Sequence, residues 1–111
     1  MTSEALLITG GTVIDPSTKR DGRFDILIEH GVLADVRPSI QAREGLTVVE
    51  AAGKLVLPGF VDLHVHFRQP GREDKETIET GSRAAVAGGF VAVCPMPNTT
   101  PAVDHGAAVE W

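Results

Sequence analysis

The first half of the chain is a series of short apolar stretches separated by glycine and polar residues. Within several of these stretches apolar and polar residues alternate, which is the pattern of a half-buried β-strand. Over residues 24–29 this alternation places Asp25 on the face opposite Ile26. His30-Gly31 follows and predicts a tight hairpin turn, with the histidine in solvent and the glycine at a position of positive φ.

Short strands joined by glycine turns are typical of a β-sandwich, so we predict that residues 1–57 are all-β. Strands are expected at residues 5–14 (two strands that meet at Gly10-Gly11), 24–29, 32–36, 47–50 and 55–57, with a loop over residues 15–22.

Beyond Pro58 the pattern becomes strand, helix, strand. A helix is expected over residues 76–87, ended by Gly88-Gly89, with a face of small residues for close packing at Ile78, Gly81, Ala84, Ala85 and Gly88. Residues 90–94 are continuously apolar, which predicts a strand buried on both faces with Cys94 in the core. The three elements predict a βαβ unit with parallel strands. Behind a cap at Asp104, a last helix over residues 105–111 stops abruptly, so we expect the chain to be cut inside this element.

The strand that starts at Gly59 contains the chemistry. Its alternation places Asp62, His64 and His66 on one face. Two imidazoles two residues apart on one strand face can reach a single metal ion; the alternative is a buried strand whose histidines only form hydrogen bonds in a core. Arg68 follows this strand and Asn98 follows the next one, so both lie past the carboxyl ends of parallel strands, where ligands bind. Arg72 and Asp74 are expected to form a solvated helix entrance.

Composition restricts the function classes. The chain has 111 residues, of which 42% are hydrophobic and 23% charged, as in an ordinary globular protein. The net charge of −5 argues against a general nucleic-acid binder. No apolar run approaches the roughly 20 residues that span a bilayer, and no signal peptide is recognisable at the start. The single cysteine fits a reducing compartment, so a cytoplasmic location is expected.

The segment Pro58–Gly71 resembles the signature of the cyclic amidohydrolases, and within them the bacterial type I dihydroorotases. Residues 75–81 and 88–101 are similar to the blocks that come next in that family. The resemblance implies an α/β fold in which half of a small β-sandwich (residues 1–57) precedes the start of a TIM-like barrel (residues 58–111: first strand, helix, second strand, truncated). It therefore implies that the chain is the N-terminal segment of a longer parent. Gln69 stands where the family more often has glutamate.

Carried over to this chain, the resemblance implies that His64 and His66 bind zinc and that Arg68 and Asn98 grip the carboxylate of dihydroorotate. A planar guanidinium suits a carboxylate, and an amide adds a directed hydrogen bond. One or two zinc ions, further metal ligands and an aspartate general acid and base are implied, the last two beyond Trp111. His30 and His105 are not placed to complete the set, so no catalytic residue is expected in this chain and we expect it to be inactive alone.

The implied reaction is the reversible cyclisation of N-carbamoyl-L-aspartate to L-dihydroorotate in pyrimidine biosynthesis, with a small-molecule substrate and neither nucleic acid nor membrane as partner. A homodimer or an association with aspartate transcarbamoylase is left open, as is the number of metals. Two alternatives remain: another cyclic amidohydrolase (dihydropyrimidinase, hydantoinase or allantoinase), for which Arg68 would be dispensable, and a non-catalytic dihydroorotase-like scaffold of aspartate transcarbamoylase, which typically lacks metal ligands.

Overall fold

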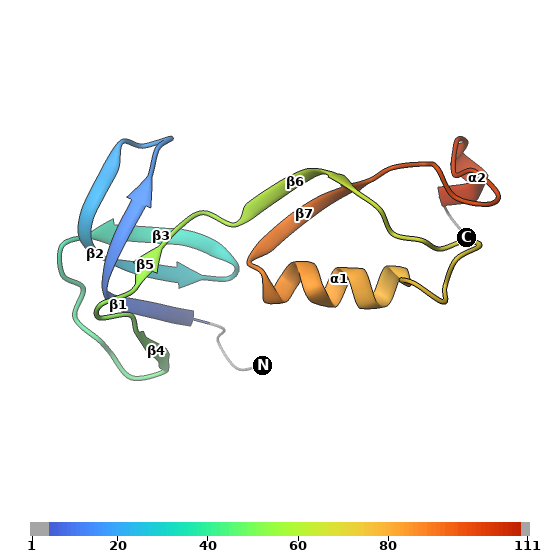
Figure 1. Ribbon diagram of the computed structural model, residues 1–111. Helices are drawn as coiled ribbons and strands as arrows, with labels where there is room; N and C mark the ends of the chain where they lie inside the picture. The colour runs from blue at the N-terminus through green and yellow to red at the C-terminus, as the bar shows by residue number, and fades with distance from the viewer. Residues whose placement is uncertain (1–4, 110–111) are drawn as a thin grey trace. The chain divides into compact units, whose positions relative to one another are not determined.

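The computed structural model describes residues 5–109, and the chain divides after Pro58 into two compact units. Sheet predominates, and the α-helices lie in the second unit (Figure 1). The fold is therefore mixed α/β. Within residues 5–109, neither helix is long and apolar enough to cross a membrane. The cytoplasmic location stays a prediction.

The first unit is one five-stranded sheet organised around its first strand. Two antiparallel hairpins join β1, β2 and β3, and β4 and β5 pair in parallel with successive parts of β1. The strands are β1 (Ala5–Asp15), β2 (Arg20–Glu29), β3 (Val32–Arg37), β4 (Leu46–Glu50) and β5 (Leu55–Val56).

Two boundaries in this unit differ from the sequence prediction. β1 is one continuous strand, because its pairing with β2 shifts between Ile8 and Gly11 and Gly10 takes a φ of 70°. A β-bulge thus absorbs the glycine pair without ending the strand. The expected loop over residues 15–22 shrinks to a tight turn, because the Asp15 carboxylate accepts hydrogen bonds from the Ser17 and Thr18 hydroxyls. These hydroxyls, Thr18 foremost, lower the pKa of Asp15.

The predicted hairpin turn is confirmed. His30 and Gly31 have φ values of 53° and 75°, as a two-residue turn of type I′ requires, and His30 is exposed. The alternation did not predict that Asp25 is buried. Asp25 is only 8% exposed, and its carboxylate accepts hydrogen bonds from the main-chain N–H groups of Gly10 (2.9 Å) and Ile40 (2.8 Å). Asp25 therefore links the bulge in β1 and the connector after β3 to β2.

The core of the first unit is small, and much apolar surface stays exposed. The buried apolar residues are Ala5, Leu7, Val13, Ile26, Ile40 and Ala51. Val32, Leu33 and Leu55 are each more than 60% exposed, and an open cavity of about 230 Å³ lies among apolar side chains of this unit. Nothing in residues 5–58 covers these side chains.

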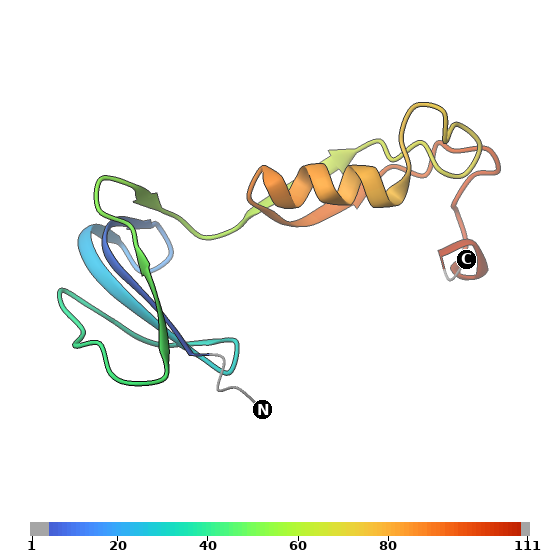
Figure 2. The same ribbon diagram turned by 90° about the horizontal axis from the view of Figure 1, so that it is seen from below.

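The second unit is a βαβ unit, as predicted. β6 (Phe60–Val65) and β7 (Phe90–Pro95) pair in parallel, and α1 (Ile78–Ala87) connects them and runs alongside both (Figures 1 and 2). The helix begins two residues later than expected, because Thr77 caps it: its hydroxyl accepts from the Thr80 N–H at 3.1 Å, and its own N–H donates to the Thr80 hydroxyl at 3.0 Å. The capping box therefore sets the start of α1.

The predicted small-residue face of α1 holds only in part: Gly81 is buried, whereas Ile78 is 51% exposed and Ala84 and Gly88 are also exposed. A Cβ atom added at Gly81 would lie 2.4 Å from Cε1 of Phe67, so only glycine allows this approach. The predicted burial of β7 on both faces is wrong: Val91 is 75% exposed and Cys94 is exposed. The reason is that a two-stranded sheet covered by one helix leaves its other face open. α2 (Gly106–Val109) begins near the expected cap, and its predicted end at Trp111 lies outside the described residues.

Candidate functional site

The predicted site residues lie where β6 and β7 end. His64 is in β6, His66 directly follows it, Arg68 lies two residues further, and Asn98 follows β7 by three residues. The Met96 N–H donates to the Val65 carbonyl at 2.9 Å and holds the two strand ends together. The structure thus brings the segments with all four predicted residues to one edge of the parallel pair.

The two histidine side chains converge. Nε2 of His64 and Nε2 of His66 are 3.3 Å apart, and the ring planes are inclined by 67°. Two imidazole nitrogens on one tetrahedral zinc ion, each at about 2.0–2.1 Å from it, lie about 3.3–3.4 Å apart. The observed separation therefore fits two ligands of one zinc ion. It also fits a hydrogen bond from one Nε2–H to the other Nε2, which is the purely structural alternative.

The second nitrogen of His66 has a partner. Nδ1 of His66 and Oδ1 of Asn98 are 3.0 Å apart. A side-chain carbonyl oxygen only accepts hydrogen bonds, so this contact puts the proton on Nδ1 and leaves the Nε2 lone pair toward His64. The sequence assigned Asn98 to the substrate alone and missed this contact, because no local pattern relates two residues 32 positions apart.

Within residues 5–109, the Asp62 carboxylate makes no hydrogen bond to either imidazole. Between Asp62 and Val65 the pairing with β7 shifts by one residue, so the simple alternation through the histidine strand is interrupted. The Asp62 carboxylate instead accepts a hydrogen bond from the main-chain N–H of His64 at 3.0 Å. It therefore fixes the backbone that presents His64.

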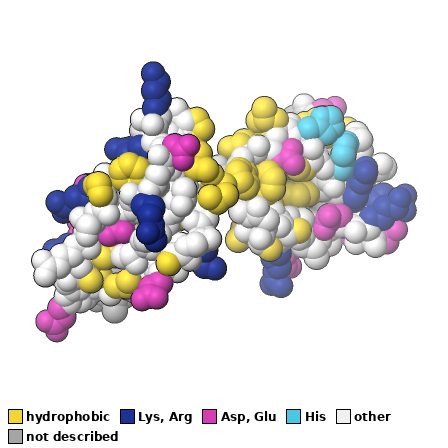
Figure 3. Space-filling view, turned by 60° about the vertical axis from the view of Figure 1, so that its left-hand side comes forward, with side chains coloured by type: hydrophobic (Ala, Val, Ile, Leu, Met, Phe, Trp, Pro, Cys, Tyr) yellow, Lys and Arg dark blue, Asp and Glu magenta, His cyan; other side chains and the backbone are white. Residues whose placement is uncertain are grey.

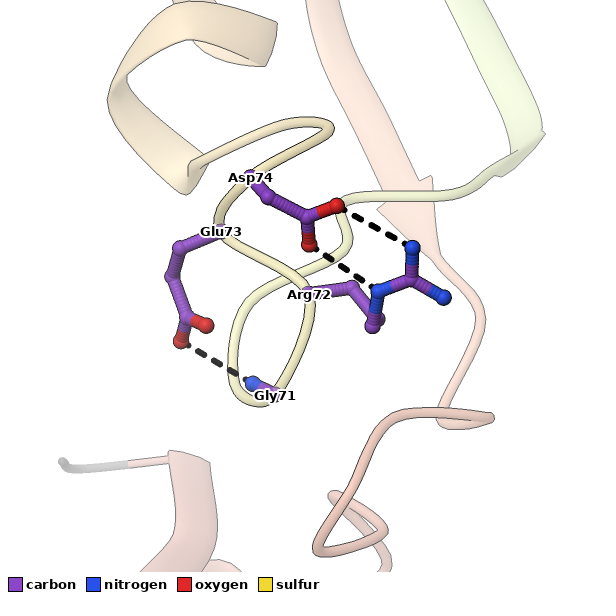
Figure 4. A network of polar contacts seen from close by, with 4 residues as sticks. All are labelled: Gly71, Arg72, Glu73 and Asp74. Atoms are coloured by element: carbon purple, nitrogen blue, oxygen red, sulfur yellow. Dashed lines mark hydrogen bonds and ion pairs between the residues drawn. The ribbon is translucent and has the colours of Figure 1, made fainter.

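Two arginines follow the histidine strand, and they differ in what they bind. Arg72 forms a bidentate pair with Asp74, at 2.9 and 3.0 Å, in the exposed loop before α1 (Figure 4). In the same loop the Gly71 N–H donates to the Glu73 carboxylate at 2.9 Å. Arg68 is half-buried, and within residues 5–109 its guanidinium has no ion-pair partner. Arg68 is therefore available to an external carboxylate, whereas Arg72 is already paired.

Arg72 and Asp74 each shift the pKa of the other. The hydrogen bonds and positive charge of Arg72 lower the pKa of Asp74, and those of Asp74 raise the pKa of Arg72. Both side chains are more than half exposed, as expected for a solvated helix entrance. His64 is exposed and His66 is half-buried; Figure 3 shows histidine side chains grouped on the surface with lysine and arginine side chains nearby.

The cavities of the second unit lie mostly beside the predicted site. One cavity, of about 400 Å³, is lined mainly by apolar side chains, including Phe67, Met96 and Val103, and by none of the four predicted residues. His66 borders a cavity of about 250 Å³ beside α1. Residues 5–109 contain no cluster of three or more histidine, cysteine or carboxylate side chains that could hold a metal ion. Two convergent imidazoles are fewer than the roughly three protein ligands of a catalytic zinc site.

A family model for dihydro-orotase-like proteins matches residues 53–111. The dihydroorotase of Trichlorobacter lovleyi is 48% identical over 106 residues (96% of this chain and 25% of that protein), and that of Anaeromyxobacter sp. strain K is 51% identical over 108 residues (97% and 25%). The chain thus spans about a quarter of the length of these curated relatives.

Similar solved structures include hydantoinases. A D-hydantoinase (dihydropyrimidinase) from Thermus sp. is 36% identical with a TM-score of 0.70, over 83% of this chain and 20% of that one. An L-hydantoinase from Arthrobacter aurescens has a TM-score of 0.80 at 24% identity, over 96% of this chain and 23% of that one, and shows the fold alone. On the family match, which covers more than half of its residues, this chain belongs to the dihydroorotase-like family.

Proposed function

We propose that this chain is the N-terminal part of a dihydroorotase, which interconverts N-carbamoyl-L-aspartate and L-dihydroorotate with the help of zinc. The observation that carries the proposal is the histidine pair, whose Nε2 atoms lie 3.3 Å apart at the strand edge where Arg68 also stands. The relatives at about 50% identity are named dihydroorotases and are about four times as long. We call the protein in which this chain forms the N-terminal part the full-length enzyme.

The proposal assigns the two parts of the chain to two different domains of the full-length enzyme. Residues 1–57 form part of a β-sandwich, and residues 58–111 form the first strand, helix and second strand of a TIM-like barrel. The apolar side chains left open on both units support this, because each is a surface that further strands or helices would bury.

In this proposal His64 and His66 hold zinc, and Arg68 and Asn98 hold the substrate carboxylate. When bound, zinc supplies a Lewis acid that polarises the reacting carbonyl and activates water near neutral pH. Arg68 binds the carboxylate through a bidentate, charge-assisted pair and thereby orients the ring. The remaining metal ligands and the general acid and base come from outside residues 1–111, so the chain alone is expected to be inactive.

The hydantoinase structures support a second candidate, a cyclic amidohydrolase whose substrate has no carboxylate. Such a substrate would not require the unpaired guanidinium of Arg68 at the strand edge that bears the histidine pair. The presence of Arg68 therefore favours the dihydroorotase. A non-catalytic scaffold is disfavoured because both histidines are present and already converge.

The test is substrate binding by full-length enzyme with Arg68→Met. Loss of a partly buried charge pair costs about 2–4 kcal/mol, so dihydroorotate binding should weaken by about 30- to 1000-fold while zinc content stays unchanged. Arg72→Met is the matched control and should bind dihydroorotate normally, because Arg72 is engaged with Asp74. Unaltered dihydroorotate affinity in Arg68→Met, or equal hydrolysis of hydantoin and dihydroorotate by the wild type, would contradict the proposal.

A further inference from the structure

The hydrogen bond between His66 and Asn98 suggests a role for Asn98 that the substrate alone does not require. We propose that Asn98 is a positioning residue: its Oδ1 holds His66 in the tautomer that binds metal, while its Nδ2 donates to the substrate carboxylate. This inference rests on the proposed function for the carboxylate, but the His66 half follows from the contact within this chain.

The position of the proton on the His66 ring supports the first role of Asn98, which is to hold the metal-binding tautomer. Oδ1 of Asn98 has no hydrogen, so at 3.0 Å the hydrogen must come from Nδ1 of His66. A neutral imidazole with its proton on Nδ1 has its lone pair on Nε2. That Nε2 atom is the one that lies 3.3 Å from Nε2 of His64. Without an acceptor at Nδ1, the ring is free to put its proton on Nε2, where it would block metal binding.

The amide nitrogen of Asn98 supports the second role, the binding of the substrate carboxylate. Nδ2 of Asn98 has two hydrogens to donate, and within residues 5–109 it makes no hydrogen bond. A carboxylate accepts hydrogen bonds and donates none, so it can use Nδ2 but not Oδ1. The two roles therefore sit on two different atoms of one side chain. An aspartate at this position would still accept from His66 but could no longer donate.

The surrounding loops hold this contact in place. The Met96 N–H donates to Val65 (2.9 Å) on one side of it, and the Thr100 N–H donates to Pro70 (3.1 Å) on the other. The loops approach so closely at Gly71 that an added Cβ atom would lie 2.3 Å from the Thr100 carbonyl oxygen. Asn98 itself is exposed, so replacing its side chain empties no core. A substitution there should change the two contacts and leave the fold intact.

The experiment compares Asn98→Asp and Asn98→Ala in the full-length enzyme, with Ala102→Ser as an exposed control in the same loop. Zinc affinity is measured by competition with a chelator. Asn98→Ala should bind zinc about 10- to 100-fold more weakly, as is usual when the partner of a histidine ligand is lost. Asn98→Asp should bind zinc within about threefold of the wild type, because the acceptor remains. Both variants should bind dihydroorotate at least about tenfold more weakly, because both lose the donor.

A spectroscopic readout separates positioning from general damage. In the metal-free protein, ¹⁵N chemical shifts of the His66 ring should show the proton on Nδ1 in the wild type and in Asn98→Asp, and on Nε2 in Asn98→Ala. Equal zinc affinity and an unchanged tautomer in Asn98→Ala would overturn the positioning role, as would a loss of zinc in Asn98→Asp as large as in Asn98→Ala. A wild type that binds zinc but not dihydroorotate would instead count against the proposed function.

Discussion

Replacing Gly81 with alanine should weaken the packing of α1 against Phe67, which directly follows the histidine pair. The added Cβ atom would lie 2.4 and 2.6 Å from two ring carbons of Phe67, and ordinary carbon contacts are about 3.5–4.0 Å. The ring or the helix must therefore move by more than about 1 Å. Such overpacking costs about 1–3 kcal/mol, whereas glycine to alanine inside a helix gains about 0.5–1 kcal/mol. The expected net loss of stability is about 1 kcal/mol from the midpoints of these ranges, and at most about 2.5 kcal/mol.

A double-mutant cycle with Phe67→Ala tests the cause. Once the ring is gone, Gly81→Ala should stabilise the helix by about 0.5–1 kcal/mol, so the sign of its effect should reverse. Amide hydrogen exchange within α1 is the suitable assay, because two compact units need not unfold in one step. A Gly81→Ala variant whose α1 amides are as protected as in the wild type would refute the reasoning. So would the same destabilisation with and without Phe67.

Two further predictions concern the carboxylates of Asp25 and Asp74. Asp25→Ala should destabilise the first unit by about 2–4 kcal/mol, because two buried N–H groups lose their acceptor, and amide exchange at Gly10 and Ile40 should accelerate. Asp21 is exposed, so the control Asp21→Ala should change the stability little. Slow exchange at both amides in Asp25→Ala would contradict this prediction. Asp74 should titrate below its usual pKa, so its pair with Arg72 is intact above about pH 4 and is lost as the pH falls through the lowered value. Arg72→Met should return the pKa of Asp74 to the usual range in an NMR titration, and an unshifted curve would refute the assignment of the cause.

Local patterns predicted the elements of the second unit well. The glycine, proline and apolar signals around residues 58–95 indicated strand, helix, strand, and the structure shows parallel β6 and β7 joined by α1. The pair of histidines two residues apart also predicted two side chains that meet, although the strand is irregular just before them. The two histidine side chains still meet, because they flank Val65, which pairs again with Pro95 beyond the irregularity.

Features that depend on distant residues could not be read from local patterns. The alternation gave no sign that Asp25 is buried, yet it is buried because a bulge at Gly10 and a connector at Ile40 bring two N–H groups to it. The contact of Asn98 with His66 has the same character. Burial of β7 was overestimated because an apolar run shows that a strand can be covered, but not that its cover lies within the same residues.

The central claim is that His64 and His66 bind zinc together, and zinc affinity of single-histidine variants tests it most directly. The chain has four histidines, so His30→Ala and His105→Ala are matched controls. In full-length enzyme, His64→Ala and His66→Ala should each weaken zinc binding by at least about 100-fold, since each removes one of the roughly three protein ligands of a catalytic site. The two controls should bind zinc like the wild type. Full zinc affinity in His64→Ala or His66→Ala would contradict the account.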